Sequence, residues 1–172
     1  MSLTESGHLV AIRGRGGGTF VSDAPPLAEN RRAQLSEGRW RELLDYRIAV
    51  EVGAAVLAAE RATPDDLAPL RRHVETMRTS DFTVYRRADV FFHLGVAEAA
   101  RSARLVAAMT EVQGKMSELI GHIAHPVPVL SRSNEQHAAL VAALEQRDGW
   151  GAAQLVREHL KGTEQVLAGL MP

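Results

Sequence analysis

The chain has 172 residues, 45% of them hydrophobic, which fits one domain with a sizeable core and a small appendage. The formal net charge of -1 gives no overall basic excess for nucleic-acid binding, so any such contact has to be local. The chain has no cysteine, which excludes disulfides and thiolate chemistry. No apolar run approaches the roughly 20 residues that span a bilayer, and the N-terminus lacks the apolar segment of a signal peptide. We therefore expect a cytoplasmic, mainly helical protein without a membrane partner.

The N-terminal stretch differs from the rest of the chain. Leu9–Ile12 and Thr19–Val21 are short β-prone runs on either side of a glycine-rich turn, a pattern that predicts a β-hairpin. Arg13 and Arg15 are the charged residues of this turn, which makes them candidates for contact with a DNA backbone or minor groove. A flexible turn kept in solution by its arginines is the alternative interpretation.

A helical period begins after Gly38 and continues to Arg61. Its apolar face consists of Trp40, Leu43, Leu44, Ile48, Val52, Ala55 and Ala59. Arg47 and Glu51 project near that face, and two interpretations are open. They form an ion pair at its edge, worth about a few tenths of a kcal/mol, or Arg47 meets an anionic ligand inside the domain with bidentate geometry.

The sequence Thr63-Pro64-Asp65-Asp66 is a strong helix start. Thr63 is the predicted N-cap, Pro64 occupies the first helical position, and two acids lie in the first turn. This helix is expected to end at residues 79–81, where the next helix begins.

Three further helices are predicted in the C-terminal half. One runs from Ala103 to about Ala124 and is ended by Pro126. Ser131 or Ser133 is the expected cap of the next helix. A turn at residues 147–150 then precedes the last helix, so we expect six substantial helices in all.

One acid and three histidines lie at the centres of apolar stripes on three of these helices. Asp89 and His93 are one helical turn apart and share a face, whereas His137 and His159 belong to two later helices. A buried carboxylate and imidazole without partners are unfavourable, and a bound cation would satisfy both. The pattern indicates a divalent transition metal such as zinc, nickel or manganese; hydrogen-bonded core histidines are the alternative.

Four stretches carry a resemblance to a known family. Asp89–Leu94 looks like a D-x-x-F-H segment, Glu135–Asp148 like an E-x-H segment closed by GD, and Ala152–Leu160 like an A-A segment closed by H-L. Glu5–Ser22 is similar to a wing with the pattern G-L-V followed by G-R-G-T-F-V. Together they resemble the GntR transcription regulators of the FadR type, whose C-terminal effector-binding domain is called FCD.

The resemblance implies a fold and a domain organisation. The expected fold is an all-α antiparallel bundle of about six helices that encloses a cavity, preceded by a short β-hairpin. Residues 1–22 would be the wing of a winged helix-turn-helix domain, residues 23–38 a linker, and residues 39–172 the FCD domain. Members of the family are typically homodimers.

The resemblance also implies a ligand set. The metal ligands of the family match Asp89, His93, His137 and His159, with zinc or nickel as the expected metal. Arg47 matches an arginine near the carboxylate of the effector, and we add Glu51 and Asn134 as candidate effector contacts.

The function that follows is a ligand-responsive transcription regulator, not an enzyme, which senses a small organic acid through its bound metal. The family's recognition helix precedes the wing, and this chain begins at the wing, so we expect the chain alone to bind DNA weakly or not at all. Two alternatives remain open: a metal-dependent hydrolase or lyase, for which Glu51 is the one candidate base, and a purely structural dimerisation module.

Overall fold

The computed structural model of the chain describes residues 9–12, 18–21, 39–120 and 126–168. The chain divides into two compact units, Met1–Trp40 and Arg41–Pro172. In the first unit, strands β1 (Leu9–Ile12) and β2 (Gly18–Val21) pair antiparallel, with Leu9 opposite Val21. The turn that carries Arg13 and Arg15, and the predicted linker at residues 23–38, lie outside the described residues.

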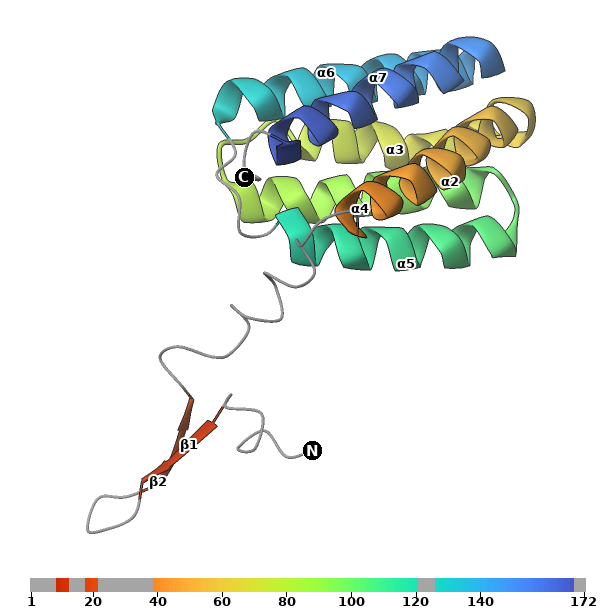
Figure 1. Cartoon of the computed structure of the whole chain (residues 1–172). Helices are drawn as coiled ribbons and strands as arrows, with labels where there is room; N and C mark the ends of the chain where they lie inside the picture. Colours follow the sequence, from red (N-terminus) through yellow and green to blue (C-terminus); the bar gives the residue numbers. More distant parts are fainter. Residues whose placement is uncertain (1–8, 13–17, 22–38, 121–125, 169–172) are drawn as a thin grey trace. The chain divides into compact units, whose positions relative to one another are not determined.

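The remaining described residues form helices joined by short connections (Figure 1). The helices are α2 (Arg39–Arg61), α3 (Pro64–Thr76), α4 (Phe82–Ala99), α5 (Ala103–Ile120), α6 (Val127–Glu145) and α7 (Gly149–Ala168). Helix α3 packs against α4 and α6, α4 also packs against α5, and α6 packs against α7. The prediction of an all-helical bundle is confirmed. Within the described ranges, no helix is both long and apolar enough to cross a membrane.

The start of α3 forms as its sequence predicts. The Thr63 side chain caps the helix through the Asp66 amide, and the Asp66 carboxylate accepts in return from the Thr63 amide at 2.8 Å. This reciprocal capping box satisfies two of the amides that a helix N-terminus leaves without partners. Gly95 of α4 leaves room for Leu70 of α3, because a Cβ atom at Gly95 would lie 2.7 Å from Cδ2 of Leu70.

The predicted start of α6 was wrong. The helix begins at Val127, and Pro126 is its N-cap without a side-chain cap hydrogen bond, so Ser131 and Ser133 lie inside the helix. Proline at the first helical positions has its backbone angle already set and lacks only an amide hydrogen that would have no partner there. Pro128, at the second helical position, is therefore compatible with a helix start at Val127, and the serines are not needed as caps.

The buried face of α2 contains two charged residues among its apolar ones. Arg47 and Glu51 are each only 2% exposed, whereas Ile48 and Val52, which the apolar pattern placed inside, are half-buried. The prediction of an ion pair at the edge of the buried face was therefore wrong about position. The pair exists but faces the interior, because residues of other helices complete its hydrogen bonds, as described below.

A buried polar centre and the adjoining cavity

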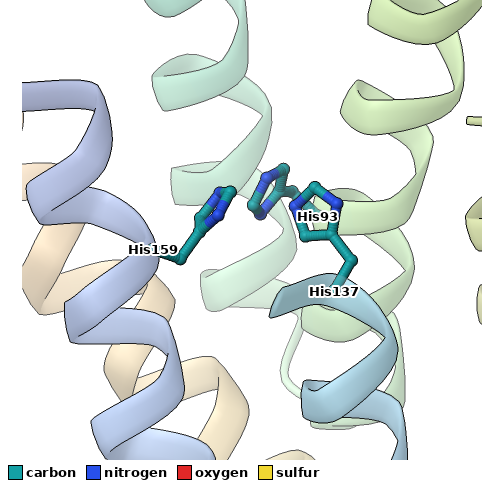
Figure 2. Close-up of side chains that lie close together, drawn as sticks. All are labelled: His93, His137 and His159. Carbon is teal, nitrogen blue, oxygen red and sulfur yellow. The ribbon is translucent and has the colours of Figure 1, made fainter. Parts of the chain in front are cut away.

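Three imidazoles from three helices converge inside the bundle (Figure 2). His93 of α4, His137 of α6 and His159 of α7 are 3%, 1% and 8% exposed. One ring nitrogen from each lies within 4.8 Å of the others. The helix-face pattern of the sequence thus predicted correctly which histidines point inward.

Hydrogen bonds to the outer nitrogens determine which ring atoms face the centre. His93 Nδ1 lies 2.8 Å from Glu51 Oε2, and His159 Nδ1 lies 3.3 Å from Oε1 of Gln136. A carboxylate or amide oxygen can only accept, so each Nδ1 carries the hydrogen and each Nε2 of a neutral ring keeps its lone pair. In the described part of the chain, His93 Nε2 and both ring nitrogens of His137 are buried without a hydrogen-bond partner.

Asp89 completes the arrangement one turn before His93 on α4. Its Oδ1 atom lies 3.7 Å from His93 Nε2 and 3.6 Å from His137 Nε2. Its Oδ2 atom accepts from Nη1 of Arg86, whose Nη2 donates to Ser117 Oγ on α5 at 3.0 Å. Arg86 therefore holds one carboxylate oxygen on the outside and leaves the other facing the imidazoles.

This donor set fits a divalent transition metal. Zinc binds imidazole nitrogen and carboxylate oxygen at about 2.0–2.2 Å, which in a tetrahedral site places neighbouring ligand atoms about 3.4 Å apart. The separations of 3.6 and 3.7 Å between Asp89 and the two imidazoles are close to that value. Buried nitrogens without partners are unfavourable, and a cation would supply the missing partner. Asp89, His93, His137 and His159 are thus the residues that could hold a metal.

The electrostatics of the centre keep most of these groups in the metal-binding form. Burial lowers the pKa of His137 well below its usual value and that of His159 to about 3, so both rings are neutral at pH 7. Burial alone would raise the pKa of Asp89, but hydrogen bonding and positive charge from His93 outweigh it, and the pKa falls well below the usual value.

His93 is the exception. Burial lowers its pKa, but the negative charges of Glu51 and Asp89 prevail and raise it to about 9. The same contact, together with the charge of Arg47, holds the pKa of Glu51 below its usual value in spite of burial. Without a metal, His93 therefore carries a proton at neutral pH, which a metal would have to displace.

A cavity of about 790 Å³ opens beside this centre. Arg47, Asp89 and His159 belong to both the cavity wall and the centre, so a molecule in the cavity could reach them. The wall also contains Tyr85, Arg86, Arg132, Ser133, Gln136 and Lys161. The hydroxyl of Tyr85 is buried there without a hydrogen-bond partner among the described residues, and burial raises its pKa above the usual value.

Two of the predicted effector contacts lie elsewhere. The Asn134 side-chain amide donates to the Val74 carbonyl at 3.0 Å, and Glu51 faces His93; neither residue is part of the described cavity wall. Sequence reasoning missed Arg86 and Gln136, which hold Asp89 and His159. For Arg86 a signal existed, since Arg at three residues before Asp on one helix face forms a local ion pair.

Comparison with known proteins agrees with this geometry. The FCD domain family matches residues 42–162, which is more than half of the chain. The chain belongs to the FCD domain family. The resemblance to the FCD domains of GntR-type transcription regulators, drawn above from the motifs, is thereby confirmed.

Relatives and solved structures support the same placement. A putative L-lactate dehydrogenase operon regulatory protein of Escherichia coli K12 is 29% identical over 163 residues, 88% of this chain and 63% of the relative. The putative HTH-type transcriptional regulator RmpR of Mycobacterium gastri is 30% identical over 92% of this chain and 61% of its own length. The chain thus spans less than two thirds of these relatives. The solved structure of E. coli McbR/YncC has a TM-score of 0.71 at 19% identity, covering 98% of this chain and 80% of that one, and shows the shared fold.

Proposed function

We propose that this chain is the ligand-sensing part of a transcription regulator, which recognises a small organic acid next to a bound divalent metal. Asp89, His93, His137 and His159 would hold the metal, with zinc or nickel as the expected ions. The observation that carries the proposal is the set of buried imidazole nitrogens without partners in the described part of the chain, beside a cavity that reaches Asp89 and His159.

The residues of the centre have separate tasks in this proposal. Arg86 and Gln136 fix Asp89 and His159, so that their free donor atoms face inward. A bound metal would supply open coordination positions for a carboxylate and an adjacent hydroxyl. Arg47 reaches the cavity wall from α2 and would neutralise the charge that remains on the acid.

A 2-hydroxy acid is the first ligand class to test. Its carboxylate and neighbouring hydroxyl can bind one metal as a pair of oxygen donors. The name of the E. coli relative connects that protein with an operon for L-lactate dehydrogenase, and L-lactate is a 2-hydroxy acid. L-Lactate is therefore a suitable first probe, with larger hydroxy and sugar acids as the next candidates for a cavity of this volume.

Regulation would pass from the cavity to DNA-binding domains in a cytoplasmic homodimer. The antiparallel pair β1–β2 would be the wing of such a domain, with Arg13 and Arg15 at its tip and residues 23–38 as the linker to the FCD domain at residues 39–172. The acid acts as a signal only if it binds two arrangements of the dimer with different affinity.

A metal-dependent hydrolase or lyase is less well supported. Such an enzyme needs a general base with access to water, and Glu51 was the one candidate from the sequence. Its carboxylate is 2% exposed and already accepts from Arg47, His93 and Gln113. Its lowered pKa also makes it a weak base.

Elemental mass spectrometry on protein purified without a metal-affinity step tests the proposal. We expect about one equivalent of a transition metal per chain, and its loss in the His137→Ala variant. The His73→Ala variant is the matched control, because His73 lies outside the centre and stacks on Phe91. Absence of metal from the wild-type protein, with no change in melting temperature on addition of zinc or nickel, would contradict the proposal.

A further inference from the structure

Glu51 connects two parts of the site that the proposed function treats separately. Its carboxylate is 2% exposed and has partners on three helices. Oε1 accepts from Arg47 Nε on its own helix at 2.6 Å and from Gln113 Nε2 of α5 at 3.2 Å. Oε2 lies 2.8 Å from Nδ1 of His93 on α4. One carboxylate thus contacts both a candidate metal ligand and the arginine that reaches the cavity.

The contact with His93 determines which ring nitrogen is available to a metal. An ionised carboxylate only accepts, so Nδ1 of His93 must carry a hydrogen, and Nε2 must be the donor atom. Nε2 of His93 lies 3.7 Å from Asp89 Oδ1, and it is buried without a hydrogen-bond partner among the described residues. A carboxylate behind a histidine ligand fixes the ring orientation and makes the ligand more basic.

The contact with Arg47 determines how that side chain enters the cavity. Glu51 takes up the Nε hydrogen at 2.6 Å, so the guanidinium keeps its two terminal nitrogens as further donors. Arg47 is 2% exposed and belongs to the cavity wall, so Glu51 holds a side chain that a ligand in the cavity could contact. Gln113 binds the same Oε1 atom from α5 and restricts the carboxylate further.

A buried ion pair of this kind is weak support for a purely structural role. Removing charges from water is costly, and well-packed apolar residues in their place are often as stable. Hydrogen bonds from three helices to one carboxylate instead define positions accurately, as a site for a small ligand requires.

We propose that Glu51 is a positioning residue shared by the metal and the acid: it aims Nε2 of His93 at the metal and the free end of Arg47 at the carboxylate of the ligand. The inference rests on the proposed function and deepens it. It implies that one substitution, at a residue outside the cavity wall, weakens the binding of both the metal and the acid.

The Glu51→Gln variant tests the inference, because it keeps the shape of the side chain but replaces one accepting oxygen by a donating NH₂ group. That group cannot accept from His93 or Arg47, so one of the two contacts is lost or reversed. The Glu111→Gln variant is the matched control: Glu111 accepts from Lys115 four residues away on the exposed face of α5. Zinc affinity is measured by competition with a chelator, and L-lactate binding by calorimetry at saturating zinc.

We expect zinc affinity to fall about 10- to 100-fold in Glu51→Gln, and L-lactate affinity to fall about tenfold even with zinc saturating, because a neutral amide holds Arg47 in position less firmly than the charge-assisted hydrogen bond of the carboxylate does. The hydrogen on His93 Nδ1, visible by NMR of the zinc-loaded wild type, should weaken or disappear. Glu111→Gln should match the wild type in all three measurements. If Glu51→Gln does not fold, Glu51→Asp is measured instead, because it keeps the charge but shortens the reach to His93 and Arg47.

Two outcomes would overturn the inference and are distinguishable. Zinc binding by the wild type with equal affinity in the Glu51 variants would overturn the positioning role and leave the proposed function intact. Failure of the wild type to bind zinc would overturn the proposed function, and the inference with it.

Discussion

An apolar core and a polar centre are both buried inside the bundle, and they differ in whether their side chains have all the partners they need. The apolar core, represented by Leu70, Phe92, Met109 and Leu144, is complete by packing alone. The polar centre, formed by Arg47, Glu51, Asp89, His93, His137 and His159, is equally buried. On α4 the two are adjacent in sequence, at Phe92 and His93, and the Phe92 ring lies 4.5 Å from the ring of His137.

The comparison separates residues that stabilise the fold from residues that are available to bind a ligand. Apolar side chains gain from burial without needing specific partners. Buried nitrogens gain only if each has a partner, and several in the polar centre have none among the described residues. The neutral imidazoles of the polar centre, His137 and His159, are therefore expected to contribute little to the stability of the metal-free protein and much to ligand binding. The predictions below separate the two roles.

The largest expected change in stability comes from the apolar core. Leu70 of α3 is 0% exposed, and its side chain lies against Gly95 of α4. Leu70→Ala should lower the free energy of unfolding by about 2–5 kcal/mol, through lost burial and the cavity left behind. Denaturant unfolding measures this change, and elemental analysis of the folded variant should still find the wild-type amount of metal. Loss of metal from a folded Leu70→Ala protein would mean that the two regions are not separate.

For His159→Ala we expect the reverse of Leu70→Ala: a loss of metal binding with little loss of stability in the metal-free protein. Zinc at about 100 times its dissociation constant should stabilise the wild type by about 2.7 kcal/mol, because it binds only the folded state. The variant should lose most of that gain but unfold, without metal, at nearly the wild-type denaturant concentration. Denaturant unfolding with zinc and with a chelator gives both values. A large loss of stability in the chelator would show that His159 is a structural core residue.

The pH dependence follows from His93. Its pKa is raised to about 9, so its proton stabilises the metal-free folded state fully below the unfolded value of 6.5, and this contribution is lost as the pH rises through 9. Zinc must displace the same proton, so zinc affinity should rise about tenfold per pH unit between pH 7 and 8.5. Stability without metal and affinity for metal thus change in opposite directions. Chelator competition at several pH values measures the affinity, and a flat profile would contradict the account of His93.

The smallest expected effect lies outside both regions, at the start of α3. Asp66 accepts hydrogen bonds from Thr63, which lower its pKa from 3.8 to about 2. Asp66→Ala should cost about 1 kcal/mol of stability, whereas Asp65→Ala, at an exposed position in the same turn, should cost less. Because the pKa of Asp66 is lowered, its contribution is present above pH 3.8 and is lost as the pH falls towards 2. Equal costs for the two variants at neutral pH would contradict the capping role.

The sequence predicted the helices and the inward histidines better than the contacts around them. The turn at residues 147–150 was recognisable from its glycine and aspartate, and the Asp148 carboxylate does accept from the Gly151 amide at 2.8 Å. His137 and His159 were predicted to face inward because the period of a helix relates each residue to its own stripe. Helix periodicity relates only residues of the same helix, so it predicts which side chains face inward but not which residues of other helices they contact.

Contacts between distant helices had no such signal. Glu51 and His93 are on different helices, so no spacing in the sequence relates them, and Glu51 was assigned to the effector instead. The same holds for Gln113, whose partner Glu51 is 62 residues away. Asn134 is buried on the same helix as His137, but its amide donates to the Val74 carbonyl of a neighbouring helix. Only the packing of the helices determines which of several inward polar groups meet.

The central claim is that the polar centre becomes a binding site for an acid when a metal is present. Calorimetric titration of L-lactate into the zinc-loaded and the metal-free protein tests it most directly, with a larger hydroxy acid such as gluconate in parallel. We expect heat of binding for at least one of these acids with the zinc-loaded protein, and affinity at least about tenfold weaker without metal, since oxygen donors to the metal would be lost. Equal affinity in both forms would contradict the claim, because Arg47 and the cavity alone would then account for recognition.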